Sequence, residues 1–204
     1  METKDIDFSK LSPMMKQYFE VKNKYKNHIL FYRLGDFYEM FFDDAIIASR
    51  ELELTLTGRD CGLEERAPMC GVPHHACDVY LKKLIEKGYN VAICEQTMDP
   101  AMCKGIVPRE VIRVVTPGTL IESSMLDETS NNYICAFYMR AKESALCLAD
   151  ISTGEVHLFE FEGKEMTSSA INELSRFSPA EILINDAFLS NKELSSLSLI
   201  HISE

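Results

Sequence analysis

The chain has 204 residues, of which 46% are hydrophobic and 26% charged, and a formal net charge of −11 at pH 7. This length suits one large domain or two smaller ones, and the composition is that of an ordinary globular protein rather than a disordered or fibrous one. No apolar stretch is long enough to span a bilayer and the first five residues are not typical of a signal peptide, so we expect a cytoplasmic protein. Seven cysteines at irregular intervals predict reduced, buried thiols rather than a disulfide framework.

The negative charge is unevenly distributed along the chain. Residues 1–118 carry 16 Lys and Arg against 18 Asp and Glu, a net of −2, which leaves 5 against 14, a net of −9, for residues 119–204. A dominant phosphate-binding surface is usually more basic than the first part. The first part can still present a basic face, which is typical of one weak contact within a larger assembly.

A helix is the first predicted element. Ser12 is a favourable N-cap and Pro13 suits the first helical position, which predicts a helix that continues to about Lys26. We interpret Lys22, Lys24 and Lys26 as the solvated end of this helix, where lysines complement the helix dipole.

A β-hairpin is predicted over residues 28–44, because Gly35-Asp36 separates two apolar runs. Side chains alternate along a strand, so Phe37, Glu39 and Phe41 should share one face. An exposed Phe beside a Glu suits a ring that inserts between base steps, next to a carboxylate that hydrogen-bonds a base edge. From the residues alone, a core Phe37 with a solvated Glu39 stays the commoner interpretation.

Further helices and strands alternate through the rest of the chain. A helix is predicted from Asp43-Asp44 through residue 52, and another over 76–87 with Val79, Tyr80, Leu84 and Ile85 on its apolar face. The predicted strands of the first part cover residues 52–57, 68–72, 91–94 and 110–116. The first part should therefore be a mixed α/β sheet flanked by helices.

Residues 119–132 are polar and acidic and are interpreted as a linker. Three short strands follow over 133–139, 145–151 and 155–161, then a helix over 167–177 and an apolar run over 181–185. This order is typical of the start of a ribonuclease H-like α/β domain, which we expect to be incomplete at residue 204.

Several stretches together resemble the amino-terminal region of the MutS family of DNA mismatch-recognition proteins. They are LSPMMKQYFEVKNKY, FYRLGDFYEMFFDDA, LTLTGRD, PMCGVPHHA, YLKKLIEKGYNVAICEQ and VIRVVTPGT, followed more loosely by LADISTGEVHLFEF. They occur in family order over most of residues 11–162. GDFYE, AICEQ and VTPGT in series are highly specific.

The resemblance implies a mismatch-recognition domain over residues 1–118, a linker over 119–132 and the start of a connector domain over 133–204. It implies that Phe37 stacks on the mispaired base and that Glu39 hydrogen-bonds to it. Arg33 and Arg59 match positions that are often basic in the family and are predicted to contact DNA phosphates.

For the whole protein, the resemblance implies an ATPase that uses ATP and magnesium, a DNA clamp and a homodimer, all formed by regions further along the polypeptide. This chain contains no GxxxxGK[ST] motif, so we expect neither enzyme activity nor a cofactor in it. The implied partners are mismatched double-stranded DNA and, through the connector domain, downstream mismatch-repair proteins, with no membrane partner.

Three alternatives stay open. Asp36, Glu39, Asp43 and Asp44, or Asp150 in the second part, could form a two-metal nuclease site. The segment from Cys70 to Cys77, with His74 and His75, offers four possible zinc ligands, although their spacing matches no usual zinc pattern. The acidic second part could be a protein-interaction module.

Overall fold

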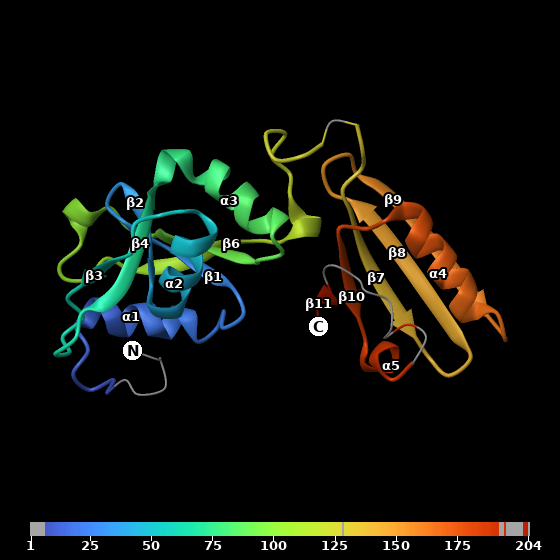
Figure 1. The fold of residues 1–204 in the computed structure, drawn as a ribbon, viewed down its shortest axis with the longest axis horizontal. Helices are drawn as coiled ribbons and strands as arrows, with labels where there is room; N and C mark the ends of the chain where they lie inside the picture. Colours follow the sequence, from blue (N-terminus) through green and yellow to red (C-terminus); the bar gives the residue numbers. More distant parts are fainter. Residues whose placement is uncertain (1–6, 128, 192–193, 195–201, 204) are drawn as a thin grey trace. The chain divides into compact units, whose positions relative to one another are not determined.

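The computed structural model describes residues 7–127, 129–191, 194 and 202–203, and the chain divides into two units, Met1–Val115 and Thr116–Glu204 (Figure 1). The predicted mixed α/β class is confirmed, since each unit is built on a mixed sheet with helices. The boundary predicted at residue 118 lies three residues beyond the division at Val115. Within the described residues, no helix is long and apolar enough to cross a membrane.

The first unit is a six-stranded sheet with strand order β3-β4-β2-β1-β5-β6. Its strands are β1 (Ile29–Leu34), β2 (Phe37–Phe41), β3 (Thr57–Arg59), β4 (Ala67–Pro73), β5 (Val91–Gln96) and β6 (Arg109–Val115). Its helices are α1 (Pro13–Lys22), α2 (Phe42–Glu51) and α3 (Cys77–Glu86), with short 3-10 turns η2 (His74–Ala76) and η3 (Pro100–Met102). The predicted hairpin is confirmed: Leu34 pairs with Phe37 across the turn, and Gly35 has a φ of 57°, which suits glycine.

Helix α1 covers one face of this sheet with an aromatic cluster. The Tyr18 ring makes edge contacts with Tyr32 and Phe41 at centroid distances of 5.4 and 5.1 Å, and its hydroxyl donates to the Phe41 carbonyl at 3.3 Å. On the opposite face, α2 and α3 pack against β4, and the thiol of Cys70 donates to the Ala45 carbonyl at 3.5 Å. Strand β2 is therefore held between two helical layers along most of its length.

Helix α1 ends at Lys22, four residues before the predicted end, and Lys22 is not a solvated lysine. Its ammonium group donates to Asp44 Oδ1 at 2.8 Å and to the His28 carbonyl at 2.5 Å. The lysine therefore ties the end of α1 to the start of α2. The interpretation of Lys22 as a solvated helix end was wrong, whereas Lys24 and Lys26 are exposed.

The strand predicted over residues 52–57 is wrong. Helix α2 runs to Glu51, and the Leu52 and Leu54 N–H groups bond back to the Ala48 and Ser49 carbonyls, each at 2.9 Å. Strand β3 then covers only Thr57–Arg59.

Helix α3 buries Leu84 and Ile85 as predicted, but Val79 and Tyr80 of the predicted apolar face are not buried. Its buried residues are Cys77, Leu81, Leu84 and Ile85, whereas Val79 is 60% exposed. The buried positions follow the helical repeat from Cys77, and Val79 lies outside that stripe.

The second unit has strand order β11-β10-β7-β8-β9. Its elements are η4 (Pro117–Thr119), β7 (Tyr133–Met139), β8 (Glu143–Asp150), β9 (Glu155–Glu162), α4 (Met166–Phe177), β10 (Glu181–Ile184), α5 (Asp186–Leu189) and β11 (Ile202–Ser203). The first three strands form an antiparallel meander, and β10 then pairs parallel to β7. This order confirms the predicted ribonuclease H-like layout.

The stretch from Thr116 to Thr119 packs within the second unit. The buried Glu181 on β10 accepts hydrogen bonds from the Thr116 hydroxyl and from the Gly118 N–H, the latter at 3.1 Å. A Cβ atom on Gly118 would lie 2.8 Å from Cβ of Ile134 and 2.9 Å from Cβ of Glu181, so only glycine fits here. In the predicted linker that follows, Leu120 and Met125 are buried.

Candidate nucleic-acid interface

Phe37 is the first residue of β2 and lies directly after the hairpin turn. It pairs with Leu34 on β1 and with Pro73 on β4. These three residues lie at the end of the sheet where β1 and β4 finish and β2 begins. Its side chain is 47% exposed, whereas Phe41 at the other end of the same strand is fully buried. Phe37 is therefore not a core residue, and the commoner interpretation fails for it.

Glu39 is two residues further along β2, on the same face as Phe37. Its side chain is only 15% exposed, and its Oε2 accepts a hydrogen bond from Nη1 of Arg59 at 2.5 Å. Arg59 lies on β3, with β4 between the two strands. Glu39 is therefore an ion-paired carboxylate, not the solvated strand-edge charge of the commoner interpretation.

Gly71 on β4 lies directly opposite Glu39. A Cβ atom there would lie 3.2 Å from the Tyr38 carbonyl oxygen and 3.5 Å from Cγ of Glu39. Because glycine has no side chain, the side chain of Glu39 can lie over β4 at this position.

Arg33 is not brought to this face. It pairs with Tyr38, and directly opposed residues point to the same side of a sheet, so Arg33 lies on the face opposite to Glu39. Its guanidinium contacts Glu95 Oε1 at 3.2 Å and the Gly35 carbonyl at 2.5 Å, and its side chain is 16% exposed. Phe37, Glu39 and Arg59 therefore lie on one face of the sheet. Arg33 lies on the other face, where its guanidinium contacts Glu95 and Gly35. Phosphate contacts by Arg33 and Arg59 stay predictions.

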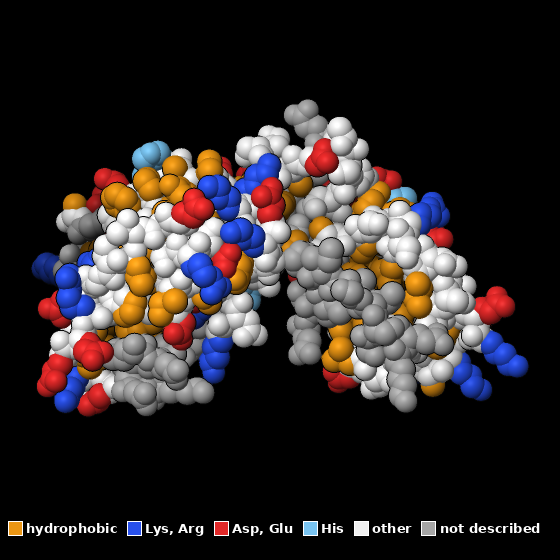
Figure 2. Space-filling model, in the orientation of Figure 1, with side chains coloured by type: hydrophobic (Ala, Val, Ile, Leu, Met, Phe, Trp, Pro, Cys, Tyr) orange, Lys and Arg blue, Asp and Glu red, His pale blue; other side chains and the backbone are white. Residues whose placement is uncertain are grey.

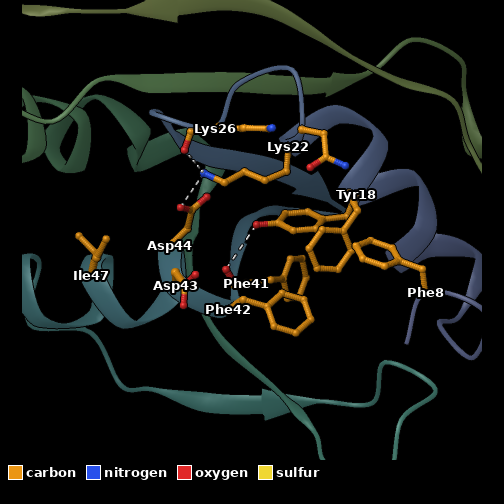
Figure 3. Close-up of a pocket in the computed structure, with 11 residues that line it drawn as sticks. Phe8, Tyr18, Lys22, Lys26, Phe41, Phe42, Asp43, Asp44 and Ile47 are labelled. Carbon is orange, nitrogen blue, oxygen red and sulfur yellow. Dashed lines mark hydrogen bonds and ion pairs between the residues drawn. The ribbon is translucent and has the colours of Figure 1, made fainter. Parts of the chain in front are cut away.

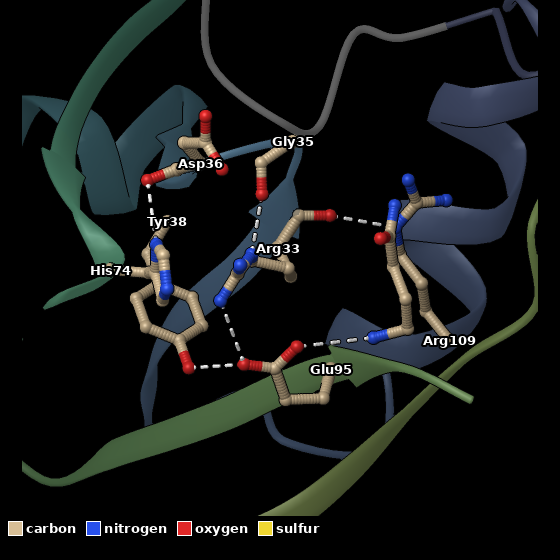
Figure 4. Close-up of polar contacts among 8 residues, drawn as sticks. Arg33, Gly35, Asp36, Tyr38, His74, Glu95 and Arg109 are labelled. Carbon is tan, nitrogen blue, oxygen red and sulfur yellow. Dashed lines mark hydrogen bonds and ion pairs between the residues drawn. The ribbon is translucent and has the colours of Figure 1, made fainter. Parts of the chain in front are cut away.

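Polar contacts from three other segments hold the hairpin (Figure 4). The Tyr38 hydroxyl donates to Oε1 of Glu95 on β5, which the Arg33 guanidinium also contacts. Arg109 on β6 donates to the Arg33 carbonyl at 2.7 Å. The His74 N–H donates to the Asp36 carbonyl at 2.9 Å, which fixes the turn itself.

Sequence reasoning missed Glu95, Arg109 and His74 as parts of this region. Burial raises the pKa of the Tyr38 hydroxyl well above its usual range, and the neighbouring Glu95 carboxylate raises it further. Tyr38 therefore stays a neutral hydrogen-bond donor at physiological pH. The sequence signal that could have identified Glu95 is a charged residue at the end of an apolar strand, in the AICEQ stretch.

A cavity of about 530 Å³ lies at the other end of β2 (Figure 3). Its lining residues are Phe8, Tyr18, Phe19, Lys22, Asn23, Lys26, Phe41, Phe42, Asp43, Asp44 and Ile47. Asp44 inside it is paired with Lys22 and accepts the Leu30 N–H at 3.0 Å. Burial raises the pKa of Asp44, and Lys22 opposes this shift. These contacts tie α1, β1 and α2 together, which is a structural role.

Residues 12–124 match the family model of MutS domain I, and residues 132–203 match that of MutS domain II. The chain belongs to the MutS family. The two matched MutS domains correspond closely to the two units of the structure.

Curated relatives agree with this assignment. DNA mismatch repair protein MutS of Acetivibrio thermocellus is 54% identical over 184 residues, which cover 90% of this chain and 21% of that protein. The MutS proteins of Clostridioides difficile and Clostridium perfringens are 52% and 56% identical, over 98% and 87% of this chain and 21% and 20% of their own lengths. This chain therefore spans about a fifth of the length of these MutS proteins.

Two carboxylates of the nuclease alternative, those of Asp44 and Asp150, are engaged in other contacts. Both carboxylate oxygens of Asp150 are engaged: Oδ1 accepts from the Ser152 N–H and hydroxyl at 2.8 and 2.6 Å, and Oδ2 accepts from the Asn132 N–H at 3.1 Å. Asp44 is engaged with Lys22, as described above. Throughout the described part of the chain, no three His, Cys, Asp or Glu side chains are grouped to hold a metal ion.

Two possible ligands in the zinc segment, Cys70 and His74, make separate contacts. Cys70 is buried in β4, and burial raises its pKa to about 12. His74 instead contacts Asp36 through Nδ1 at 3.1 Å. None of the seven cysteines, all within the described residues, forms a disulfide, and they are buried except for the partly exposed Cys103 and Cys147.

Charged side chains of both signs cover the first unit. On the face seen in Figure 2, acidic side chains lie among the basic ones. This mixture accords with the net charge of −2 over residues 1–118. Affinity for DNA phosphates from such a surface is expected to be modest.

Proposed function

We propose that the first unit recognises mismatched double-stranded DNA in DNA mismatch repair, with Phe37 as the residue that stacks on the mispaired base. The observation that carries this proposal is the exposure of Phe37, 47%, at the end of a strand whose other aromatic residues, Tyr38 and Phe41, are buried. The printed name of the relatives, DNA mismatch repair protein MutS, supports the same role.

An aromatic ring can select a mismatch without reading sequence. Inserting a side chain between base steps requires local unstacking and kinking of the duplex, which is easier at a badly paired step than at a Watson–Crick step. The stacking contact itself contributes about 1–3 kcal/mol per base. The hydrogen bonds to Tyr38 and Asp36 fix the hairpin, so Phe37 enters the duplex without a large loss of backbone freedom.

Glu39 supplies a hydrogen-bonding group beside the stacked base in this proposal. Phosphates repel a carboxylate, so Glu39 adds discrimination between duplexes more than affinity for them. Arg59 contacts only one of its two oxygens, Oε2, among the described residues. The other oxygen, Oε1, can accept a hydrogen bond from a base edge.

For the whole protein we propose a homodimer that clamps DNA, with ATP and magnesium bound by regions outside this chain. The residues present here do not fit that cofactor, because the sequence has no GxxxxGK[ST] motif and the described residues group no three metal-ligating side chains. Contact with downstream mismatch-repair proteins is assigned to the acidic second unit, and the protein to the cytoplasm.

The proposal is tested by binding of the 204-residue chain to two fluorescently labelled duplexes that differ only by a central G·T mismatch. Fluorescence anisotropy at low salt, with protein up to millimolar concentration, should show tighter binding to the mismatched duplex. Equal binding to both duplexes, or binding to neither, would contradict the assignment of mismatch recognition to this chain.

A further inference from the structure

The ion pair between Glu39 and Arg59 joins two residues that were each predicted to contact DNA separately. Nη1 of Arg59 lies 2.5 Å from Oε2 of Glu39, and the two side chains are 36% and 15% exposed. Among residues 7–127 and 129–191, Arg59 is the only basic side chain in ion-pair contact with Glu39. A guanidinium that already neutralises a carboxylate contributes less charge to a phosphate contact.

We propose that Arg59 is a positioning residue for Glu39. The Arg59 guanidinium holds the Glu39 carboxylate in one orientation and neutralises its charge beside the DNA. This inference rests on the proposed function of Phe37 and Glu39. Without Arg59, an anionic group would approach the duplex within a few ångströms of its phosphates, and repulsion would disfavour the orientation that reaches a base edge. When Arg59 is bound to Oε2, the Glu39–Arg59 pair has a net charge near zero, and Oε1 of Glu39 stays available to the base edge.

The geometry of the strands supports this role. Arg59 reaches Glu39 across β4, and the Glu39 side chain leans over Gly71 of β4, where a Cβ atom would lie 3.5 Å from its Cγ. An arginine that served only to bind phosphate would not need to reach a carboxylate two strands away. Arg59 therefore acts on DNA through Glu39 and is not an independent phosphate contact.

A double-mutant cycle separates the two roles of Arg59. The 204-residue chain, its Arg59→Gln and Glu39→Gln variants and the double variant are compared for the ratio of affinities for G·T-mismatched and matched duplexes. Arg59→Gln should lower this ratio about 10-fold or more, as expected for loss of a charge-assisted hydrogen bond. In the Glu39→Gln background the same change should have little further effect, because its partner is already absent.

Two more variants sharpen the test. Arg59→Lys retains the positive charge and should restore part of the ratio. Arg66→Gln removes an exposed arginine just before β4 and should leave the ratio unchanged. The salt dependence of binding is measured for each variant, because loss of a phosphate contact lowers the slope by about one unit on a logarithmic plot.

Equal loss of affinity for both duplexes in Arg59→Gln, which leaves the ratio unchanged, together with a reduced salt slope, would overturn the proposal and make Arg59 a phosphate contact. Additive effects of Arg59→Gln and Glu39→Gln on the ratio would overturn it as well. Phe37→Ala distinguishes these results from failure of the proposed function. If Phe37→Ala abolishes mismatch preference while the cycle is additive, only the role of Arg59 is wrong; if Phe37→Ala has no effect, the proposed function itself fails.

Discussion

The hydroxyl of Tyr38 donates a hydrogen bond to Glu95 Oε1 and thereby joins the second strand of the hairpin to β5, with β1 between them. The same carboxylate oxygen lies 3.2 Å from Nη1 of Arg33. One acidic side chain therefore holds both strands of the hairpin immediately behind Phe37. This contact is on the face of the sheet opposite to Glu39.

Substitutions at this contact should loosen the hairpin without removing any residue proposed to touch DNA. Tyr38→Phe should lower the free energy of unfolding of the first unit by about 1 kcal/mol, since one hydrogen bond is lost. Glu95→Ala should cost more, because the Tyr38 hydroxyl and Nη1 of Arg33 both lose their contact with Glu95, although Arg33 keeps the Gly35 carbonyl. Urea denaturation followed by circular dichroism measures both changes, and mismatch preference should fall in parallel.

Tyr138→Phe is the matched control, since Tyr138 is 56% exposed in the second unit. It should change neither stability nor DNA preference. A Glu95→Ala variant as stable and as selective as the unchanged chain would show that the contact does not position the hairpin.

A second prediction concerns the buried Glu181. Its carboxylate accepts hydrogen bonds from the Thr116 hydroxyl and the Gly118 N–H. A variant that lacks it leaves the buried Gly118 N–H without this acceptor, and the Thr116 hydroxyl keeps the Thr119 hydroxyl, 2.9 Å away. Glu181→Ala should therefore destabilise the second unit by about 2–3 kcal/mol in thermal or urea unfolding. Glu162→Ala, at an exposed position of β9, should change stability by less than about 0.5 kcal/mol. Equal stability of the two variants would refute a structural role for the Glu181 contacts.

A third prediction is a pH dependence that arises from Asp150. Burial raises the pKa of this carboxyl, but the Ser152 hydroxyl and the N–H groups of Asn132, Ser152 and Thr153 outweigh burial and hold the pKa below its ordinary value of 3.8. A carboxylate with a lowered pKa stabilises the folded state above the unfolded pKa, and this contribution is lost as the pH falls through the folded pKa.

Asp150→Asn should therefore lower the free energy of unfolding by about 1–2 kcal/mol at pH 7. The difference from the unchanged chain should shrink below pH 3.8, as Asp150 becomes protonated in both folded and unfolded states. Unfolding measured from pH 2 to pH 7 tests this, with the exposed Glu160→Gln as control. A difference that stayed constant over this range would contradict the assigned role of the charge.

Local signals in the sequence predicted the elements whose ends carry strong turn chemistry. Gly35-Asp36 fixed the hairpin because glycine adopts the positive φ that the turn requires, and the strand over residues 133–139 was predicted with the observed bounds. The predicted strand over 52–57 failed because backbone hydrogen bonds at the end of α2 hold Leu52 and Leu54 instead. Such bonds depend on where the preceding helix stops, which apolar periodicity does not determine.

The candidate site was predicted only in part for a similar reason. The spacing of Phe37 and Glu39 placed them on one face, but nothing local to Glu39 indicates that Arg59, 20 residues away and two strands across, is its partner. Arg33 was grouped with them from family resemblance, and only its register opposite Tyr38 shows that it lies on the other face. Side-chain contacts between strands depend on the order of the strands in the sheet, and the sequence analysis did not predict that order.

The measurement that tests the central claim most directly is the G·T mismatch preference of the Phe37→Ala variant, compared with Phe8→Ala in fluorescence anisotropy. Phe8 is 48% exposed and Phe37 is 47% exposed, so the two variants remove similar surface from the first unit. Phe37→Ala should remove most of the preference, since stacking contributes about 1–3 kcal/mol, while Phe8→Ala should retain it. A Phe37→Ala chain that still prefers the mismatched duplex as strongly as the unchanged chain would contradict the account.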